Sequence, residues 1–119
     1  MFNYKKYKIP VRRPLSQFVY NGYAMIGDSA AMTIPLNGSG LSLCALASKI
    51  LSDVIIANKD SEFNKELLWQ YQKLYYDSVS YSLSVLDAFK ILLLKLDDKE
   101  LNYIFKNING YDKSSIIKR

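Results

Sequence analysis

An apolar residue recurs at every third or fourth position from residue 63 to residue 96, and this repeat limits the folds open to the chain. The stripe consists of Phe63, Leu67, Tyr71, Leu74, Tyr81, Val85, Phe89, Leu92 and Leu96, with Ser78 in the same register. This spacing is that of an α-helix with one buried face, and it persists for about nine turns. The pattern therefore predicts one long helix, or two helices with a bend at 78–84.

A second helix is expected over residues 41–57. Its apolar residues follow the i, i+3, i+4 spacing and are Leu43, Leu46, Ala47, Ile50, Leu51 and Val54. Because this segment is apolar around most of its circumference, we expect it to be deeply packed.

Polar residues mark where the later helices begin and end. Asp60 or Ser61 is the expected N-cap of the long helix. The Asp97-Asp98 pair can cap a further short helix at about 98–107, which Gly110 would end.

The first thirty residues favour short extended segments. Apolar residues alternate at Tyr7, Ile9 and Val11, which predicts a short strand followed by a proline-bounded turn. Asn21-Gly22 is a turn signal. The apolar run 23–26 that follows it is typical of a strand buried on both faces.

Composition excludes several kinds of chemistry. The 119 residues include no histidine and one cysteine. Histidine-based general bases, catalytic triads, disulfides within the chain and cysteine-ligated metal clusters are therefore excluded, and we expect no metal site. Cys44 is interpreted as an inert buried thiol, and the cysteine usage fits a reducing compartment.

Length and patterning predict one domain, with helix over at least half of the residues. Within it we distinguish a strand and turn at 1–20, a strand, loop and helix at 21–58, and a helical region at 59–119. There is no signal-peptide pattern and no apolar run long enough to span a membrane, so we expect a cytoplasmic protein. Peripheral contact with a membrane surface stays open.

The net charge of +5 lies entirely in the N-terminal quarter. Its basic residues are Lys5, Lys6, Lys8, Arg12 and Arg13. No nucleic-acid-binding motif accompanies them, so nucleic acid is not an expected partner. Arg12 and Arg13 are either solvated surface residues or contacts to a phosphate of a cofactor or an anionic lipid.

The most specific pattern lies within residues 22–47. A short apolar strand leads into Gly27-Asp28, where the carboxylate would stand at the strand's C-terminal tip. Small residues beginning at Ser29 follow, and leave room for a ligand against the backbone. By itself, Asp28 could equally be a strand-end carboxylate that caps a turn.

The second half of this pattern is Pro35-x-x-Gly38-x-Gly40, which opens the helix at Leu41. The glycines permit close approach of a ligand and unusual backbone angles. The first N–H groups of the helix form a positive end that can stabilise negative charge. Considered alone, Ser39 is a residue of a flexible loop and a possible N-cap.

Together these residues resemble the Gly-Asp-Ala motif of the large flavoprotein family that includes aromatic hydroxylases and geranylgeranyl reductases. The upstream sequence Ile-Pro-x-Arg-x-Pro at 9–14 and the long helix with Tyr71 resemble the geranylgeranyl reductase branch. Members of that branch reduce isoprenoid double bonds in membrane lipids. Ser29 stands where the family usually has alanine.

The resemblance implies FAD as the cofactor. It would place Gly27, Asp28 and Ser29 at the ribityl and pyrophosphate region of FAD. It would place the loop that begins at Pro35, with the backbone of Gly38, Ser39, Gly40 and Leu41, against the pyrimidine edge of the flavin. No side chain is expected to act as a catalytic acid or base.

The Gly-x-Gly-x-x-Gly fingerprint with which such enzymes begin is absent from the sequence. The fold expected is mainly α with one or two short β-strands, a C-terminal fragment of an α/β, Rossmann-like FAD-binding protein. The parent protein would be an enzyme that reduces double bonds of an isoprenoid or other lipid. The alternative is a non-catalytic helical interaction module that has lost the cofactor and self-associates through the stripe. In either case, we expect a homo-oligomer when the chain is expressed alone.

Overall fold

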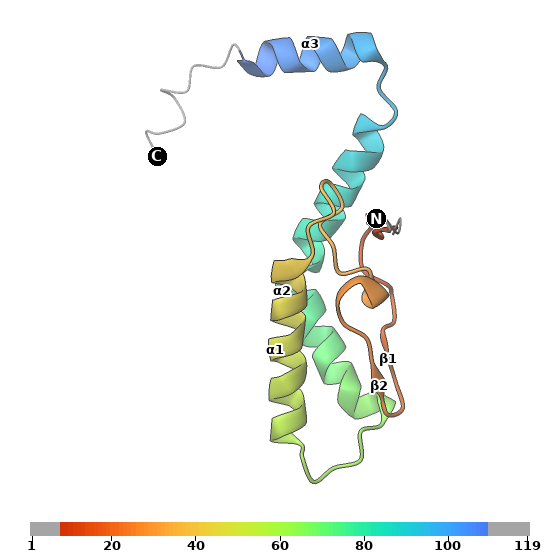
Figure 1. Ribbon diagram of the computed structural model, residues 1–119, viewed down its shortest axis with the longest axis vertical. Coiled ribbons are helices and arrows are strands. Elements are labelled where there is room, and N and C mark those ends of the chain that lie inside the picture. The colour runs from red at the N-terminus through yellow and green to blue at the C-terminus, as the bar shows by residue number, and fades with distance from the viewer. Residues whose placement is uncertain (1–7, 110–119) are drawn as a thin grey trace, which may run out of the picture. The chain divides into compact units, whose positions relative to one another are not determined.

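A computed structural model describes residues 8–109 of the chain. Its elements are strands β1 (Val19–Tyr20) and β2 (Tyr23–Ala24), the 3-10 helix η1 (Gly27–Ala30), and helices α1 (Leu41–Ala57), α2 (Lys65–Leu93) and α3 (Asp98–Asn109) (Figure 1). The three α-helices hold 17, 29 and 12 residues, more than half of the described chain. The expectation of a mainly helical fold with short strands is therefore confirmed.

The chain divides into two compact units, Met1–Ala88 and Phe89–Arg119. The first unit contains the hairpin, η1, α1 and most of α2. The second contains the end of α2 and all of α3. No helix within residues 8–109 combines the length and the apolar character needed to cross a membrane.

Strands β1 and β2 form an antiparallel hairpin around the predicted Asn21-Gly22 turn. Val19 lies opposite Ala24, and Tyr20 lies opposite Tyr23. Gly22 has a φ of +65°, a backbone conformation that L side chains rarely adopt. The turn was therefore predictable from its sequence.

The expectation that 23–26 is a strand buried on both faces was wrong. β2 ends at Ala24, and Tyr23 and Ile26 keep 54% and 36% of their surface exposed. Within the described residues β2 pairs only with β1, so a two-stranded sheet leaves much of this apolar run uncovered.

The segment that precedes the hairpin also differs from its prediction. Residues 8–12 form tight turns instead of a strand, because Ile9 and Pro10 accept the N–H groups of Val11 and Arg12. Tyr7, the first residue of the predicted strand, lies outside the described residues. The buried Thr33 hydroxyl donates to the carbonyl of Pro10 over 2.5 Å, and so ties this segment to the loop before α1.

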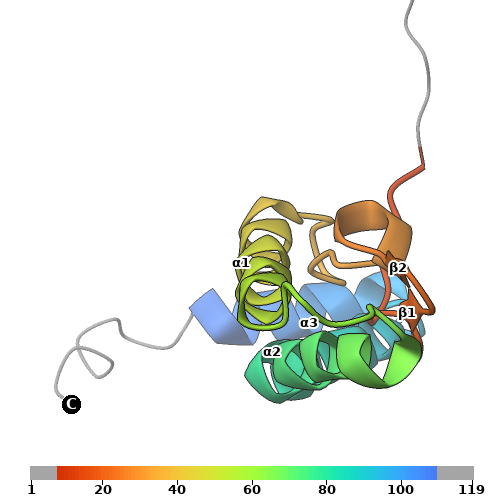
Figure 2. The same cartoon turned by 90° about the horizontal axis from the view of Figure 1, so that it is seen from below.

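The core of the first unit forms where α1, α2 and the residues beside the hairpin meet (Figure 2). Its buried members are Phe18, Val19, Ala30, Met32, Leu43, Ala47, Val54, Leu68, Tyr71, Tyr75 and Leu83. The Phe18 ring is at the centre, with edge-on contacts to Tyr71 at 5.4 Å and Tyr75 at 5.8 Å. These aromatic contacts join the strand to the long helix.

Gln72 supplies a polar connection inside this core. It is fully buried, its Oε1 accepts the N–H of Phe18 at 2.9 Å, and its Nε2 donates to the carbonyl of Ser16 at 3.0 Å. Both bonds satisfy backbone groups that burial would otherwise leave unpaired. Gln72 therefore fixes the position of the chain before β1 against α2.

α2 is a single helix that continues through 78–84, but its buried face differs from the predicted stripe. Leu68, Tyr75 and Leu83 are buried, whereas Leu74 and Tyr81 are 49% and 83% exposed. Leucine and tyrosine occur on both faces of this helix, so spacing alone could not identify the packed one. Tyr71 is buried as the stripe predicts. Towards the end of the helix the buried face departs from the stripe, and Leu83 and Asp87 lie two positions after the stripe residues Tyr81 and Val85.

α1 has the predicted bounds, but the expectation that it is deeply packed was wrong. Leu43, Ala47 and Val54 are buried, while Leu41 and Ile56 are 85% and 70% exposed. One face of the helix packs in the core of the first unit. The apolar residues on its other faces are left uncovered by the described chain.

The N-cap predicted for the long helix was also wrong. Asn64 Oδ1 accepts the N–H of Leu67 at 2.9 Å, and Asn21 Oδ1 accepts that of Lys65 at 2.8 Å. Asp60 and Ser61 lie instead in the turn that follows α1. The residue that caps α2 is therefore closer to the helix than expected.

In the second unit, α3 begins as predicted. Asp97 Oδ1 accepts the N–H groups of Lys99 and Glu100 at 2.8 Å, and Glu100 Oε2 accepts the N–H of Asp97 at 2.9 Å. This reciprocal pair is a capping box. Gly110, predicted to end the helix, lies outside the described residues.

Candidate functional site

The Gly27-Asp28 pair begins a tight turn between the hairpin and α1. Gly27 has a φ of +64°, and the carbonyls of Gly27 and Asp28 accept the N–H groups of Met32 and Ala31, each at 3.0 Å. Ala31 itself has a φ of +54°, which is rare for a residue with a side chain. The turn therefore reverses the chain and leaves the Asp28 side chain exposed.

The Asp28 carboxylate stands beside the residue that precedes α1. Its Oδ1 lies 3.6 Å from the position that a Cβ would take on Gly40, the N-cap of the helix. That Cβ would also lie 3.1 Å from the Met32 carbonyl, which is tighter than most real contacts. The structure thus brings Asp28 close to Gly40.

The N terminus of α1 is open. Within residues 8–109 no side-chain hydrogen bond caps it, and the first intrahelical bond shown runs from the N–H of Cys44 to the carbonyl of Gly40. The N-cap is Gly40, so the possibility that Ser39 caps the helix was wrong. Leu41, the first residue of α1, is 85% exposed. Helix N–H groups without intrahelical partners carry partial positive charge and can bind an anionic group.

The rest of the loop is held by its own backbone. Pro35 is buried, the N–H of Gly38 donates to Ile34, and Asn37 Oδ1 accepts the N–H of Ser39 at 3.0 Å. Gly38 has a φ of +73° and lies beside Ile9. Its role in the structure is to turn the loop against the N-terminal segment.

Ser29 and Cys44 lie close to the same turn. The Ser29 hydroxyl donates to the carbonyl of Ile26 at 2.7 Å, so it stabilises the entry into η1. Cys44 Sγ lies 3.3 Å from the position that a Cβ would take on Gly27. The thiol is half-buried, not the fully buried group that was expected.

A buried tyrosine contacts the chain just before the turn. The Tyr71 hydroxyl donates to the carbonyl of Met25 at 2.9 Å, at the end of the hairpin. Burial, with smaller effects from Tyr75 and Cys44, raises the pKa of Tyr71 well above its ordinary value. Tyr71 therefore stays neutral and acts as a fixed hydrogen-bond donor beneath the Gly27-Asp28 turn.

Arg12 and Arg13 do not meet this turn but border a separate hollow against α2. Arg13 Nε donates to Asp87 Oδ2 at 3.2 Å, and both arginines line the hollow with Ser80 and Ser84. Sequence reasoning missed the α2 residues. The signal that could have found them is the i, i+4 spacing of Tyr76, Ser80 and Ser84.

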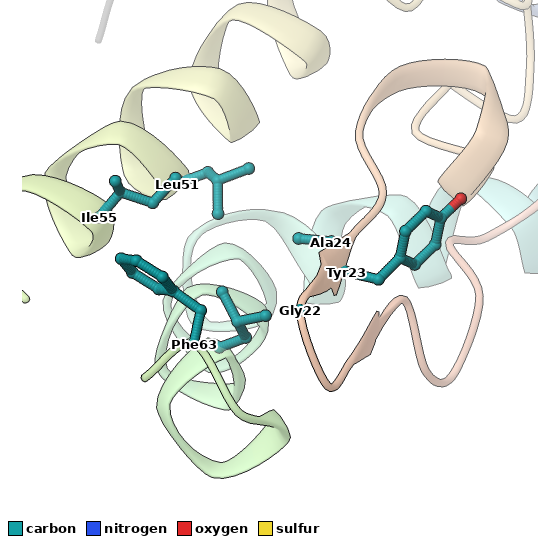
Figure 3. Close-up of a pocket in the computed structure, with 7 residues that line it drawn as sticks. Gly22, Tyr23, Ala24, Leu51, Ile55 and Phe63 are labelled. Carbon is teal, nitrogen blue, oxygen red and sulfur yellow. The ribbon is translucent and has the colours of Figure 1, made fainter. Parts of the chain in front are cut away.

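An apolar groove of about 380 Å³ opens between β2, α1 and the start of α2 (Figure 3). Its lining consists of Gly22, Tyr23, Ala24, Leu51, Ile55, Phe63 and Leu68. Leu51, Ile55 and Phe63 face one another, while the Tyr23 ring points away from them (Figure 3). The lining that the described residues provide is apolar and contains no charged group.

No protein-family model matches the chain. Curated proteins do match it over most of its length. It is 29% identical over 111 residues to digeranylgeranylglycerophospholipid reductase 2 of Methanothermobacter thermautotrophicus, covering 92% of this chain and 29% of the relative. It is 29% identical over 99 residues to digeranylgeranylglycerophospholipid reductase of Sulfolobus acidocaldarius, covering 82% and 22%. The Methanococcus vannielii enzyme of the same name is 31% identical over 101 residues, covering 83% and 26%.

The short strand, the Gly-Asp turn and the glycine loop that opens an apolar helix are the features by which the sequence resembles a flavoprotein segment. The matches to digeranylgeranylglycerophospholipid reductases support a place for the chain in the geranylgeranyl reductase-like family of oxidoreductases. It spans about a quarter of the length of the curated relatives that it matches.

Proposed function

We propose that this chain forms one side of the FAD site in a reductase. The observation that carries the proposal is the exposed Asp28 carboxylate beside Gly40, at an α1 N terminus that no side chain caps. A carboxylate is suited to accept hydrogen bonds from the ribityl hydroxyls of FAD. Gly27 and Ser29 would hold the carboxylate in place through the turn that they form.

The loop from Pro35 to Leu41 would face the pyrimidine edge of the flavin. The open N–H groups of α1 and the positive end of the helix favour negative charge at that position. The chain's contribution is therefore electrostatic, in support of the reduced, anionic cofactor. Bound FAD would supply the hydride for the reduction, and no side chain of this chain is needed as an acid or base.

The proposed substrate is an isoprenoid or other lipid with reducible double bonds. This proposal is supported by the relatives, whose names state that they act on a digeranylgeranylglycerophospholipid. Such a substrate would bring the protein to a membrane surface as a peripheral contact. The complete reaction would belong to the whole protein, of which this chain would be one part.

The test is a titration of the chain with FAD, followed by flavin fluorescence, on wild type, Asp28→Ala and the control Asp60→Ala. Asp60 lies exposed in the turn after α1, so its removal changes charge equally without touching the site. We expect weak, saturable binding that Asp28→Ala lowers at least about tenfold and Asp60→Ala leaves unchanged. Equal affinity in all three proteins would overturn the assignment of Asp28.

A graft extends the test if the chain alone binds too weakly. The corresponding segment of the Methanothermobacter reductase is replaced by residues 8–109, and the FAD content of the purified hybrid is measured. We expect a yellow protein that loses FAD on Asp28→Ala. A folded hybrid that keeps full FAD occupancy with Asp28→Ala would contradict the proposal.

A second candidate is a non-catalytic module that self-associates through α2. It is favoured by the apolar residues that α2 leaves exposed, among them Leu74, Tyr81 and Val85 at 49%, 83% and 50%. Exposed apolar surface of this kind is typical of an interaction face. A folded chain that binds no FAD and forms a stable dimer would favour this candidate.

A further inference from the structure

We propose that the hollow between the Arg12-Arg13 segment and α2 binds a phosphate group. Its volume is about 190 Å³. The polar residues that line it are Arg12, Arg13, Ser16, Tyr76, Ser80 and Ser84. Two guanidinium groups and several hydroxyls are the donors that proteins use to surround the oxygens of a phosphate.

One arginine of the hollow is held in place by a buried carboxylate. Asp87 is 5% exposed, and its Oδ2 accepts the Nε–H of Arg13 at 3.2 Å. A guanidinium carries five N–H donors, and this bond uses only one of them. Asp87 therefore orients Arg13 while leaving its terminal nitrogens suited to a second anion.

Arg12 supplies the second positive charge. Within residues 8–109 it makes no ion pair, and its side chain is exposed. With Asp87 offsetting one arginine, the hollow keeps a net positive charge.

The hydroxyls come from one face of α2. Tyr76, Ser80 and Ser84 follow at i, i+4 spacing, so they lie one above another along the helix. The Tyr76 hydroxyl donates to the carbonyl of Leu15 and so fixes the arginine segment across from the serines. Ser80 and Ser84 are then placed to donate to the oxygens of a phosphate that the arginines hold.

This inference goes beyond the proposed flavin site and stands on different residues. None of the residues from Gly27 to Leu41 lines the hollow. The same chemistry could come from a phospholipid headgroup or from free phosphate. The experiments below distinguish a lipid headgroup from free phosphate, and they distinguish either ligand from FAD.

The first experiment titrates the full chain with inorganic phosphate by calorimetry, at constant ionic strength in chloride buffer. The variants are Arg12→Gln and the control Lys59→Gln, an exposed lysine in the turn after α1. We expect Arg12→Gln to weaken binding at least about tenfold and Lys59→Gln to leave it unchanged. Equal weakening in both variants, or no binding by wild type below about 10 mM phosphate, would overturn the proposal.

Ser80→Ala with Ser84→Ala tests the hydroxyls. Both serines lie on one helix, where alanine is the better helix former, so the double variant should fold as wild type does. We expect it to weaken phosphate binding about threefold to tenfold, with an unchanged circular dichroism spectrum. Unchanged affinity would show that the hollow is not the binding site.

Vesicles then identify the source of the phosphate. Co-sedimentation is measured with vesicles of phosphatidylcholine alone and with added phosphatidic acid, for wild type, Arg12→Gln and Lys59→Gln. Binding that needs phosphatidic acid and Arg12 assigns the hollow to a lipid headgroup. Binding of inorganic phosphate without vesicle binding assigns it to free phosphate. Vesicle binding that both variants weaken equally would show general charge attraction and contradict a specific site.

Discussion

Tyr75 is the residue at which burial and hydrogen bonding conflict most clearly. Its side chain is fully buried, and its hydroxyl has no hydrogen-bond partner among the described residues. Burial, with smaller contributions from Tyr76 and Cys44, raises the pKa of Tyr75 from 10.0 to about 12. The folded chain therefore favours the neutral phenol more strongly than the unfolded chain does.

The sign of the resulting pH dependence follows from this difference. Below pH 10 the phenol is neutral in both states, and the stabilisation is fully present. As the pH rises from 10 through 12, the unfolded chain ionises first, and the free energy of unfolding falls. The raised pKa values of Tyr71 and Tyr76 act in the same direction.

Tyr75→Phe tests both properties of this side chain. Removing a buried hydroxyl that has no partner should leave the free energy of unfolding at pH 7 unchanged or raise it by about 1 kcal/mol. It should also reduce the loss of stability between pH 10 and pH 12. Urea unfolding at pH 7 and pH 11 measures both effects. Tyr103→Phe is the control, because the Tyr103 side chain is 72% exposed. A Tyr75→Phe variant less stable than wild type at pH 7 would show that the hydroxyl has a partner.

At the scale of elements, α3 depends on the capping box at its start. Asp97 satisfies two backbone N–H groups of the first turn, and Glu100 satisfies that of Asp97. Asp97→Ala removes the side chain on which this arrangement depends, at a cost of about 1 kcal/mol of helix stability. Because the box lies wholly in the second unit, we expect the loss to be local.

Amide hydrogen exchange measures this prediction residue by residue. Asp97→Ala should speed exchange in α3 about fivefold and leave the buried part of α2 around Tyr71 unchanged. Asp98→Ala is the matched control, since Asp98 is acidic in the same turn but makes none of the capping bonds described. Equal effects of the two variants would show that charge, and not the cap, stabilises the helix.

What the sequence could predict at this scale depends on how local the signal is. The bounds of α1, the Asn21-Gly22 turn and the Asp97 cap follow from residues adjacent in the chain, and all three predictions are confirmed. The packed face of α2 does not follow from adjacent residues, because it depends on where Phe18 and α1 lie in the folded chain. The ion pair between Arg13 and Asp87, which are 74 residues apart, likewise depends on the tertiary fold.

The candidate site shows the same division. Gly27, Asp28 and Gly40 were singled out by the local motif and its resemblance to a flavoprotein segment, and the structure brings Asp28 and Gly40 together. Ser80 and Ser84 could not be connected with Arg12 before the fold was known. Whether these groups bind FAD and phosphate stays a prediction.

At the scale of the whole molecule, many large apolar side chains stay exposed within residues 8–109. On α2 they include Leu74, Tyr81 and Val85, and on α1 they include Ile56, which is 70% exposed. Monomeric proteins rarely expose contiguous apolar patches of more than a few hundred Å². We therefore expect the isolated chain to self-associate, and the predicted stripe names α2 as the contact.

Light scattering combined with gel filtration tests this expectation, and charge substitutions locate the interface. The chain should have the mass of two or more copies, and Tyr81→Lys with Val85→Lys should return it to the mass of one, because burying two lysines at a contact is costly. Ile56→Lys on α1 is the matched control and should leave the association unchanged. If Ile56→Lys is the one variant that returns the chain to the mass of one copy, the contact lies on α1. A monomer at all concentrations would mean that α2 is not an interaction face in this chain, which would remove the support for the non-catalytic candidate.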